Sequence, residues 1–174
     1  MQKLQPPVQK EQPEINPDNL KVVLDTNILV SALFPSQGKS SDILSLVLEG
    51  KLQACYSQKI MDEYDEVLSR DKFKRYFTSE RKQTVLNELK DNGLVFDDVT
   101  PSNIPMKDET DRVFYDVAKA SGAYLITNNI KDFPEDSSIL MPENIVDRFI
   151  DPFNKSSDFY KAQVLERLRR STDR

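Results

Sequence analysis

The sequence predicts an α/β domain, a three-layer sandwich in which a largely parallel central sheet is flanked by helices. Short apolar runs alternate along the chain with segments of helical periodicity, which is the pattern of strand–helix–strand units. The length of 174 residues suits one domain that can bury a core. No apolar run approaches the roughly 20 residues of a membrane span, so we expect no membrane association.

The first half of the domain is expected to run strand, helix, helix, strand and helix. A continuous apolar run predicts a short buried strand in "KVVLD", and Pro35 ends the helix-like "NILVSALF" that follows it. Ser40 or Ser41 can cap the next helix, and Gly50 can end it. The strand "LQACYS" and a second capped helix, "SQKIMDEYDEVLSR", complete this half.

The second half begins with a charged helical segment from about Ser79 to Asn92, which Gly93 ends. A third strand is expected in "LVFDDV". A helix with a strong start and a Gly stop is expected in "DETDRVFYDVAKASG", and a fourth strand in "AYLIT". A short last strand in "SSILM" precedes a helix that Pro142 begins at its first turn.

The two ends of the chain differ from the middle. Residues 1–19 are rich in Gln, Pro and charge and lack the apolar stretch of a secretion signal, so we expect a flexible tail. We expect one domain over residues 20–150 and a helical extension over 151–174. Cys55 is the single cysteine, which excludes an intrachain disulfide and favours a reducing, cytoplasmic location.

The chain contains no histidine. This excludes Ser-His-Asp and Cys-His nucleophile pairs and the usual zinc sites of His and Cys. An enzyme built on this chain would therefore use carboxylates, Lys, Ser/Thr or a bound metal. The net charge of -5 and the pI near 4.9 argue against broad, nonspecific nucleic-acid binding. A nuclease whose acidic site is bridged to phosphate by metal ions stays compatible with this charge.

Polar side chains follow two of the expected strands. Asp25 ends the first strand, and Asn128 and Asn129 follow "AYLIT"; ligands of open α/β sheets bind beyond these carboxyl ends. A structural role competes with a ligand role, because Asp25 or Asn27 could cap the first helix and Asp108 a later one. The two roles are compatible, since an acid fixed at a helix start is also a rigidly held metal ligand.

The helix "SQKIMDEYDEVLSR" carries four acids on different sides. On a wheel of about 100° per residue, Asp62 and Glu66 lie nearly opposite the apolar stripe and should be solvated. Glu63 and Asp65 fall at the two edges of the stripe, where a side chain can reach into a cleft. The wheel does not choose between these two.

Several separated acids in an α/β frame without histidine favour hard cations, which take oxygen ligands. Two such ions could activate a water and stabilise the leaving oxygen in phosphodiester cleavage. A cation would also compensate an acid buried at a strand end, where an unpaired charge is costly.

Three stretches of the sequence resemble the PIN-domain nucleases, most closely the bacterial and archaeal toxins of toxin–antitoxin pairs. They are "VVLDTNILVSAL", "SQKIMDEYDEVL" and "DETDRVFYDVAKASGAYLITNNIKDF", and the resemblance covers about residues 20 to 150. The third stretch is the most specific, because acid, helix, small-Gly turn, strand and "TNN" follow in the family's order and spacing.

The resemblance implies a set of site residues. The first three metal-binding acids of the family fall on Asp25, Glu63 and Asp111. The fourth acidic position falls on Asn129, where many relatives have Asp, and the missing charge weakens the case for a second metal. The further residues that the pattern brings near the site are Thr26, Asn27, Asp108, Asn128 and Asp132.

Carried over to this chain, the resemblance implies a Mg²⁺- or Mn²⁺-dependent ribonuclease that cleaves phosphodiester bonds of RNA. The ion held by the three acids would lower the pKa of a bound water that attacks phosphorus, and Asn129 would orient that water or a phosphate oxygen. The resemblance also implies a homodimer and, for a toxin, a small antitoxin protein that holds it inactive.

Three other interpretations stay open. A phosphatase of the aspartyl-phosphate type needs a second acid two residues after the first, where Asn27 stands. A degenerate PIN-fold binding module with little or no nuclease activity is favoured by Asn129 and by the acidic balance. The segment "KFKRYF" could contact RNA by charge and stacking, or form a helix end with a solvated basic face and an aromatic side in the core.

Overall fold

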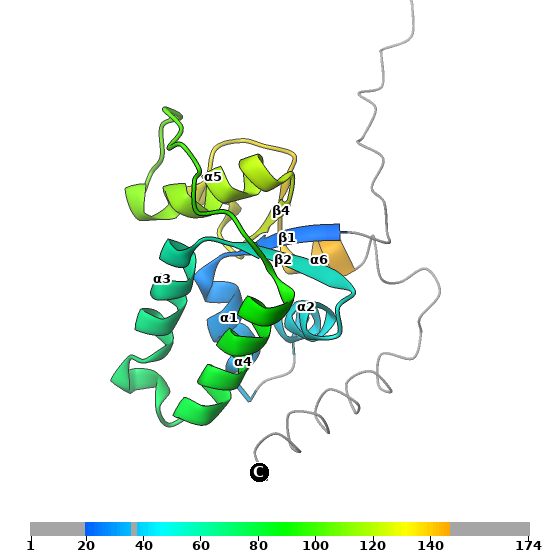
Figure 1. The fold of residues 1–174 in the computed structure, drawn as a ribbon, viewed down its shortest axis with the longest axis vertical. Coiled ribbons are helices and arrows are strands. Elements are labelled where there is room, and N and C mark those ends of the chain that lie inside the picture. The colour runs from blue at the N-terminus through cyan, green and yellow to red at the C-terminus, as the bar shows by residue number, and fades with distance from the viewer. Residues whose placement is uncertain (1–19, 36–37, 147–174) are drawn as a thin grey trace, which may run out of the picture.

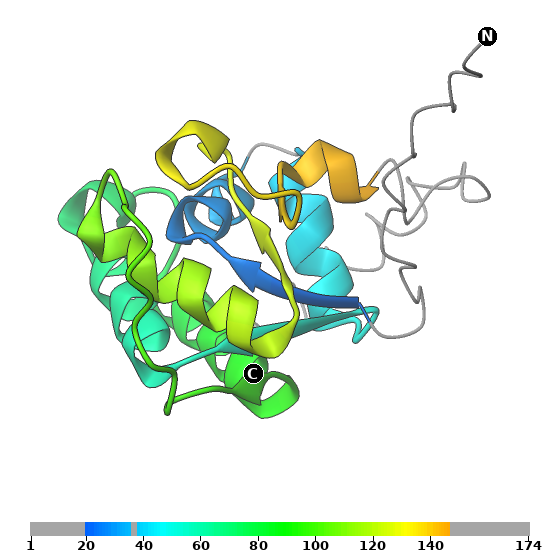
Figure 2. The ribbon, with the colours of Figure 1, turned by 90° about the horizontal axis from the view of Figure 1, so that it is seen from above.

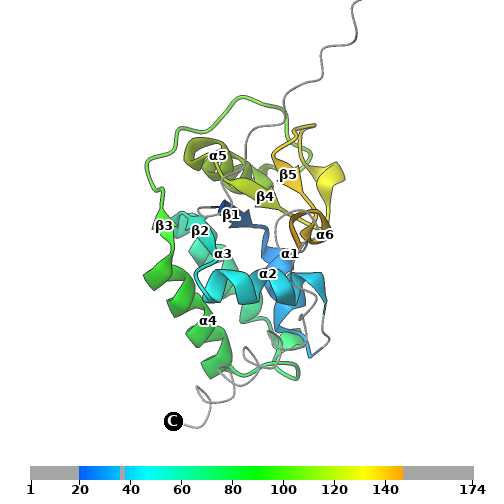
Figure 3. The ribbon, with the colours of Figure 1, turned by 90° about the vertical axis from the view of Figure 1, so that its right-hand side faces the viewer.

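Five parallel strands form one sheet at the centre of the described chain (Figure 3). The computed structural model describes residues 20–35 and 38–146, so the expected tail at 1–19 and the expected extension at 151–174 lie outside the described residues. The strands are β1 (Leu20–Leu24), β2 (Leu52–Tyr56), β3 (Leu94–Val95), β4 (Tyr124–Ile126) and β5 (Ile139–Leu140). Their order across the sheet is β3-β2-β1-β4-β5, which places β1 at the centre.

Helices flank the sheet on both faces. They are α1 (Thr26–Leu33), α2 (Lys39–Leu48), α3 (Gln58–Leu68), α4 (Ser79–Asn92), α5 (Arg112–Ser121) and α6 (Pro142–Ile145). α5 lies on one face, and α1 to α4 lie together on the other (Figures 1 and 3), which confirms the predicted three-layer α/β sandwich. Among the described helices, none is long and apolar enough to cross a membrane.

The start of α2 differs from the prediction. The helix begins at Lys39 with Gly38 at its N-cap, so neither Ser40 nor Ser41 caps it. The Ser41 hydroxyl instead donates to the carbonyl oxygen of Ala32 in α1 at 3.3 Å. The predicted cap was wrong because a tertiary partner on the neighbouring helix engages this hydroxyl.

The third strand is shorter than predicted. β3 has two residues, both exposed, at the edge of the sheet. The N–H of Phe96 extends the ladder by one hydrogen bond of 2.7 Å to the carbonyl of Tyr56. The Asp97 carboxylate then accepts a hydrogen bond of 2.7 Å from the N–H of Gln58, the first residue of α3. The strand therefore ends where the Asp97 carboxylate can accept a hydrogen bond from one of the free N–H groups at the N-terminus of α3.

The apolar residues of β1 are buried in the core, and this burial fixes the position of the residue that follows the strand. Val22 and Val23 are fully buried, and Leu24 is 2% exposed. The hydroxyl of Tyr64, in α3, donates to the carbonyl oxygen of Leu24 at 2.5 Å. β1 then leads directly into α1 (Figure 2). The backbone at Asp25, which joins the two, is therefore fixed by the core.

Candidate active site

Two neighbouring strands place Asp25 and Thr127 side by side at the carboxyl edge of the sheet. β1 and β4 pair in parallel with Leu24 opposite Ile126, so the residues that follow them are neighbours. The Asp25 N–H donates to the Ile126 carbonyl at 2.9 Å, and the Thr127 hydroxyl donates to Oδ2 of Asp25 at 2.8 Å. Asp25 is 6% exposed and Thr127 is 0% exposed, so this carboxylate is almost entirely removed from solvent.

The Asp25 carboxylate does not act as a helix cap. Asp25 occupies the N-cap position of α1, but the hydrogen bond to the second or third helical residue that defines such a cap is absent from the described structure. Burial raises the pKa of Asp25, hydrogen bonds from the Thr127 hydroxyl and the Thr26 backbone lower it, and the charge of Asp132 raises it further. A buried acid without the usual cap hydrogen bond is a candidate ligand for a cation.

The structure separates Glu63 from the other acids of α3. Glu63 is half-buried, and its Oε1 accepts a hydrogen bond of 2.8 Å from the hydroxyl of Thr26, the residue after Asp25. Asp65, at the other edge of the apolar stripe, pairs with Lys82 of α4 at 2.7 Å. Of the two positions that the helical wheel leaves open, Glu63 is therefore the one that contacts the start of α1.

Asp111 ends a short 3-10 turn (Glu109–Asp111) before α5 and is half-buried. Burial raises its pKa to about 7, and the charges of Asp25, Asp108, Glu63 and Asp132 contribute in that order. Burial also raises the pKa of Glu63, with Asp25 first among the charges that add to it. The three acids singled out by the sequence thus lie within electrostatic reach of one another, although they come from three different elements.

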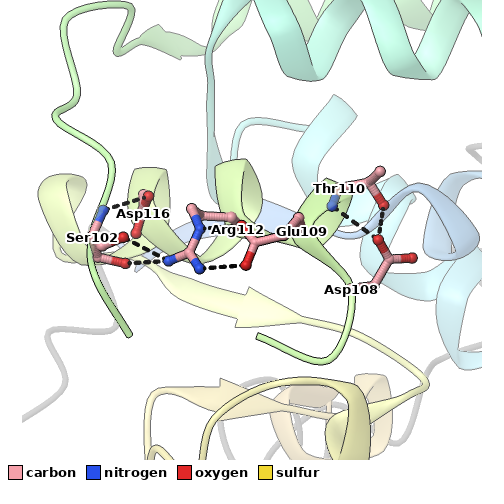
Figure 4. Close-up of polar contacts among 6 residues, drawn as sticks. All are labelled: Ser102, Asp108, Glu109, Thr110, Arg112 and Asp116. Carbon is pink, nitrogen blue, oxygen red and sulfur yellow. Dashed lines mark hydrogen bonds and ion pairs between the residues drawn. The ribbon is translucent and has the colours of Figure 1, made fainter. Parts of the chain in front are cut away.

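Hydrogen bonds on both sides hold the turn before α5 (Figure 4). Oδ1 of Asp108 accepts from the N–H and the hydroxyl of Thr110, at 2.9 and 2.7 Å, so Asp108 caps the turn, while α5 itself begins later, at Arg112. Arg112 binds Glu109 through two hydrogen bonds of 2.7 Å and the carbonyl of Ser102 through a third of 2.7 Å. Arg112 was not among the sequence candidates, and its spacing of three from Glu109 was the available signal.

The loop after β4 contributes a backbone contact and a charge. The N–H of Asn129 donates to the hydroxyl oxygen of Thr127 at 3.0 Å. Asp132 is half-buried, and its charge raises the pKa of both Asp25 and Asp111. The loop therefore supplies a negative charge to the site through Asp132, although Asn129 itself is neutral. The exposed polar residues among the sequence candidates are Asn27, Asn128, Asn129 and Asp108.

The described residues contain no group of three or more acidic side chains already arranged to hold a metal ion. Two of the carboxylates have an oxygen engaged by a threonine hydroxyl, and the charges that shift the three pKa values are all negative within the described chain. The donor chemistry fits a hard divalent cation, which takes carboxylate oxygens and would relieve this repulsion.

The basic and aromatic segment 72–77 is packed rather than open. Phe73 and Phe77 are buried, and the ring of Tyr76 lies 4.5 Å from that of Phe34, centroid to centroid. These rings are therefore not free to stack on RNA bases, because two of them are buried and the third packs against another ring. The segment matches the alternative interpretation, a basic face over an aromatic side in the core.

The fold and the site define the class of protein: a parallel α/β domain that gathers acids at the carboxyl edge of its sheet. Residues 21–131 match the PIN domain, and the chain belongs to the PIN domain family. PIN domains are generally nucleases, and PIN nucleases generally use divalent metals. The family resemblance seen in the sequence is thereby confirmed.

Two known proteins are similar to this chain over about two thirds of its length. The uncharacterized protein MJ1680 of Methanocaldococcus jannaschii is 31% identical over 111 residues, which cover 63% of this chain and 71% of that protein. The crystal structure of VapBC2 from Rickettsia felis, bound to a DNA fragment from the promoter, matches 70% of this chain and 97% of its own chain, with 19% identity and a TM-score of 0.46. Neither similarity specifies a substrate for this chain.

Proposed function

We propose that this chain is a Mg²⁺- or Mn²⁺-dependent endoribonuclease whose metal ligands are Asp25, Glu63 and Asp111. One observation carries the proposal. Carboxylates from three separate elements lie within reach of one another's charge, and no cation of the described residues is among the charges that act on them. Acids held together against their repulsion are expected where a bound cation compensates them. Membership of a family of nucleases supports the same reaction.

The residues around the three acids have separate roles in this proposal. When bound, the ion would acidify a water molecule and neutralise charge on the phosphate. Thr26 and Thr127 each donate a hydrogen bond to a single carboxylate oxygen, of Glu63 and Asp25 respectively, which leaves the second oxygen of each carboxylate for the ion. Asn129 would orient water or a phosphate oxygen through its amide, which both donates and accepts. Without a cation these acids would repel RNA phosphates, so cleavage should depend strictly on a divalent metal.

Metal-dependent cleavage and metal-dependent stability test the function together. The wild-type protein is expected to cleave an unstructured RNA with Mn²⁺, more weakly with Mg²⁺, and not at all with chelator. Millimolar Mn²⁺ should also raise the melting temperature, because a ligand that binds only the folded state stabilises it by mass action. Intact RNA together with a melting temperature that ignores Mn²⁺ would contradict the proposal.

A PIN-fold binding module with little or no nuclease activity is the second candidate function. Two observations favour it: the neutral Asn129 at the fourth acidic position, and the absence of a ready-made metal-holding group from the described residues. The same cleavage experiment distinguishes the two candidates, because a binding module leaves the RNA intact with either metal.

Asn129→Asp is expected to raise Mn²⁺ affinity and the cleavage rate about tenfold, which corresponds to about 1.4 kcal/mol. The substitution restores an anionic oxygen ligand at the start of the loop that Thr127 holds. Calorimetric titration with Mn²⁺ and initial rates on one RNA measure the two effects. Asn128→Asp is the matched control, since it adds the same charge at the preceding exposed position. Equal gains in both variants would mean that the added charge acts generally and not as a ligand.

We further propose that the protein is the toxin of a toxin–antitoxin pair, a cytoplasmic homodimer held inactive by a small antitoxin protein. The order and spacing of "DETDRVFYDVAKASGAYLITNNIKDF", which resembles the toxin branch of the family most closely, support this. Coexpression with each short reading frame adjacent to the gene should yield a co-purifying protein that blocks RNA cleavage. Failure to find one would remove the toxin proposal and leave the nuclease proposal standing.

A further inference from the structure

Thr127 joins two parts of the site through its single hydroxyl group. The hydroxyl contacts Oδ2 of Asp25 at 2.8 Å and the backbone N–H of Asn129 at 3.0 Å. A hydroxyl has one proton and two acceptor lone pairs. Because the N–H of Asn129 can only donate, the hydroxyl oxygen accepts there, and its proton is directed at the carboxylate. Both hydrogen bonds can therefore form at the same time.

The backbone around Asp25 is already fixed, so the torsion of its side chain is the freedom that remains. The N–H of Asp25 is bound to the carbonyl of Ile126, and the preceding carbonyl, of Leu24, is bound to the hydroxyl of Tyr64. The bond from Thr127 removes this remaining freedom by holding Oδ2. The same hydroxyl also sets where the loop after β4 leaves the sheet.

We propose that Thr127 is a positioning residue, which fixes the Asp25 carboxylate and the start of the Asn129 loop relative to each other. The inference rests on the proposed metal-dependent function, because only then does the orientation of Asp25 determine a ligand geometry. Thr127 is fully buried, and groups that orient metal ligands typically change metal affinity about 10–100-fold when they are removed. A threonine that served packing alone would act through its shape and not through its hydroxyl.

Two substitutions separate the hydroxyl from the shape of the side chain. Thr127→Val keeps the shape and removes both hydrogen bonds, while Thr127→Ser keeps the hydroxyl and removes the methyl group. Ser121→Ala is the matched control, because Ser121 is also buried but its hydroxyl group contacts none of the proposed metal ligands: it donates to the backbone carbonyls of Val117 and Ala118 and lies within hydrogen-bond reach of the Cys55 thiol. All variants are prepared in the full chain.

Three measurements are made on each variant: Mn²⁺ affinity by calorimetry, hydrogen exchange of the Asn129 amide in metal-free protein, and the melting temperature. Thr127→Val is expected to weaken Mn²⁺ binding about tenfold or more and to speed exchange at Asn129 about tenfold. Thr127→Ser should stay within about twofold of wild type in both, given the retained hydrogen bonds. Ser121→Ala should lower the melting temperature and leave Mn²⁺ affinity unchanged.

The outcomes distinguish the inference from the function on which it rests. If wild type binds Mn²⁺ and Thr127→Val binds it equally well, the positioning role is wrong and the nuclease proposal is unaffected. If wild type binds no Mn²⁺, the nuclease proposal is wrong. Independently of metal binding, an unchanged exchange rate of the Asn129 amide in Thr127→Val would overturn the proposed role of Thr127 in the loop. If Thr127→Val does not fold, hydrogen exchange in the other proteins still tests the positioning role. An Asn129 amide that exchanges without protection in wild type or in Thr127→Ser would overturn that role.

Discussion

Asp25→Asn is expected to reduce Mn²⁺-dependent cleavage of RNA at least about a thousandfold, equivalent to about 4 kcal/mol of transition-state stabilisation. The substitution preserves the size of the side chain and an oxygen that can accept from Thr127. It removes the charge of the most deeply buried of the three proposed ligands. Initial rates on one unstructured RNA, with Mn²⁺, Mg²⁺ and chelator, measure the loss.

Asp62→Asn is the matched control for this variant. Asp62 is an exposed acid of α3 that bonds to Gln58 of its own helix, so its substitution should leave cleavage at the wild-type rate. Metal-free Asp25→Asn should be at least as stable as wild type, because it removes a buried charge from a cluster of acids. If Asp25→Asn cleaves as fast as wild type, the activity belongs to another protein and the nuclease proposal is wrong.

Metal-free protein is expected to lose stability as the pH rises from about 4 to about 7. The pKa of Asp111 is about 7 in the folded protein, against an ordinary value of 3.8, so the folded state binds this proton more tightly than the unfolded state does. Ionised Asp111 therefore lowers the free energy of unfolding above about pH 7 and has no such effect below about pH 4. The shift alone corresponds to about 4 kcal/mol, and solvent screening of this half-buried group reduces the expected effect to about 1–2 kcal/mol.

Urea unfolding at pH 5 and pH 8 in chelator measures this dependence. Asp111→Asn should be more stable than wild type at pH 8 and should show a weaker loss of stability between the two pH values. Asp25 and Glu63, whose pKa values are also raised, should retain part of the dependence. Adding Mn²⁺ at pH 8 should stabilise wild type more than Asp111→Asn. A wild-type stability that rises between pH 5 and pH 8 in chelator would contradict the electrostatic description of the site.

The sequence by itself determined the order of the elements and the ends of most of them, because these depend on neighbours along the chain. Ser57 accepts a hydrogen bond from the N–H of Ile60 at the start of α3, as its position before an apolar periodicity predicts. Gly122 ends α5 with a φ of 70°, which glycine adopts at little cost. Pro142 begins α6. The position of Asp25 at the end of a strand followed from the same local pattern.

Local patterns were wrong where a tertiary contact competed with them. Ser41 was a reasonable cap for α2, but its hydroxyl contacts α1. The predicted third strand stops after two residues because Asp97 turns to the N-terminus of α3. In both places the polar side chain forms its hydrogen bond with a group from another element and not with a neighbour along the chain.

Only the tertiary structure decided which polar groups meet at the strand ends. The helical wheel left Glu63 and Asp65 equivalent, and the family resemblance pointed to Glu63 without giving its contacts. The structure gives them: Thr26 of α1 bonds to Glu63, and Lys82 of α4 pairs with Asp65. Thr127 gave no local signal, because its partner Asp25 lies 102 positions away in the sequence. Hydrophobic periodicity states which face of an element is buried, but not which strands become neighbours. The parallel pairing of β1 with β4 brings these two side chains together, and long-range packing of the core sets that pairing.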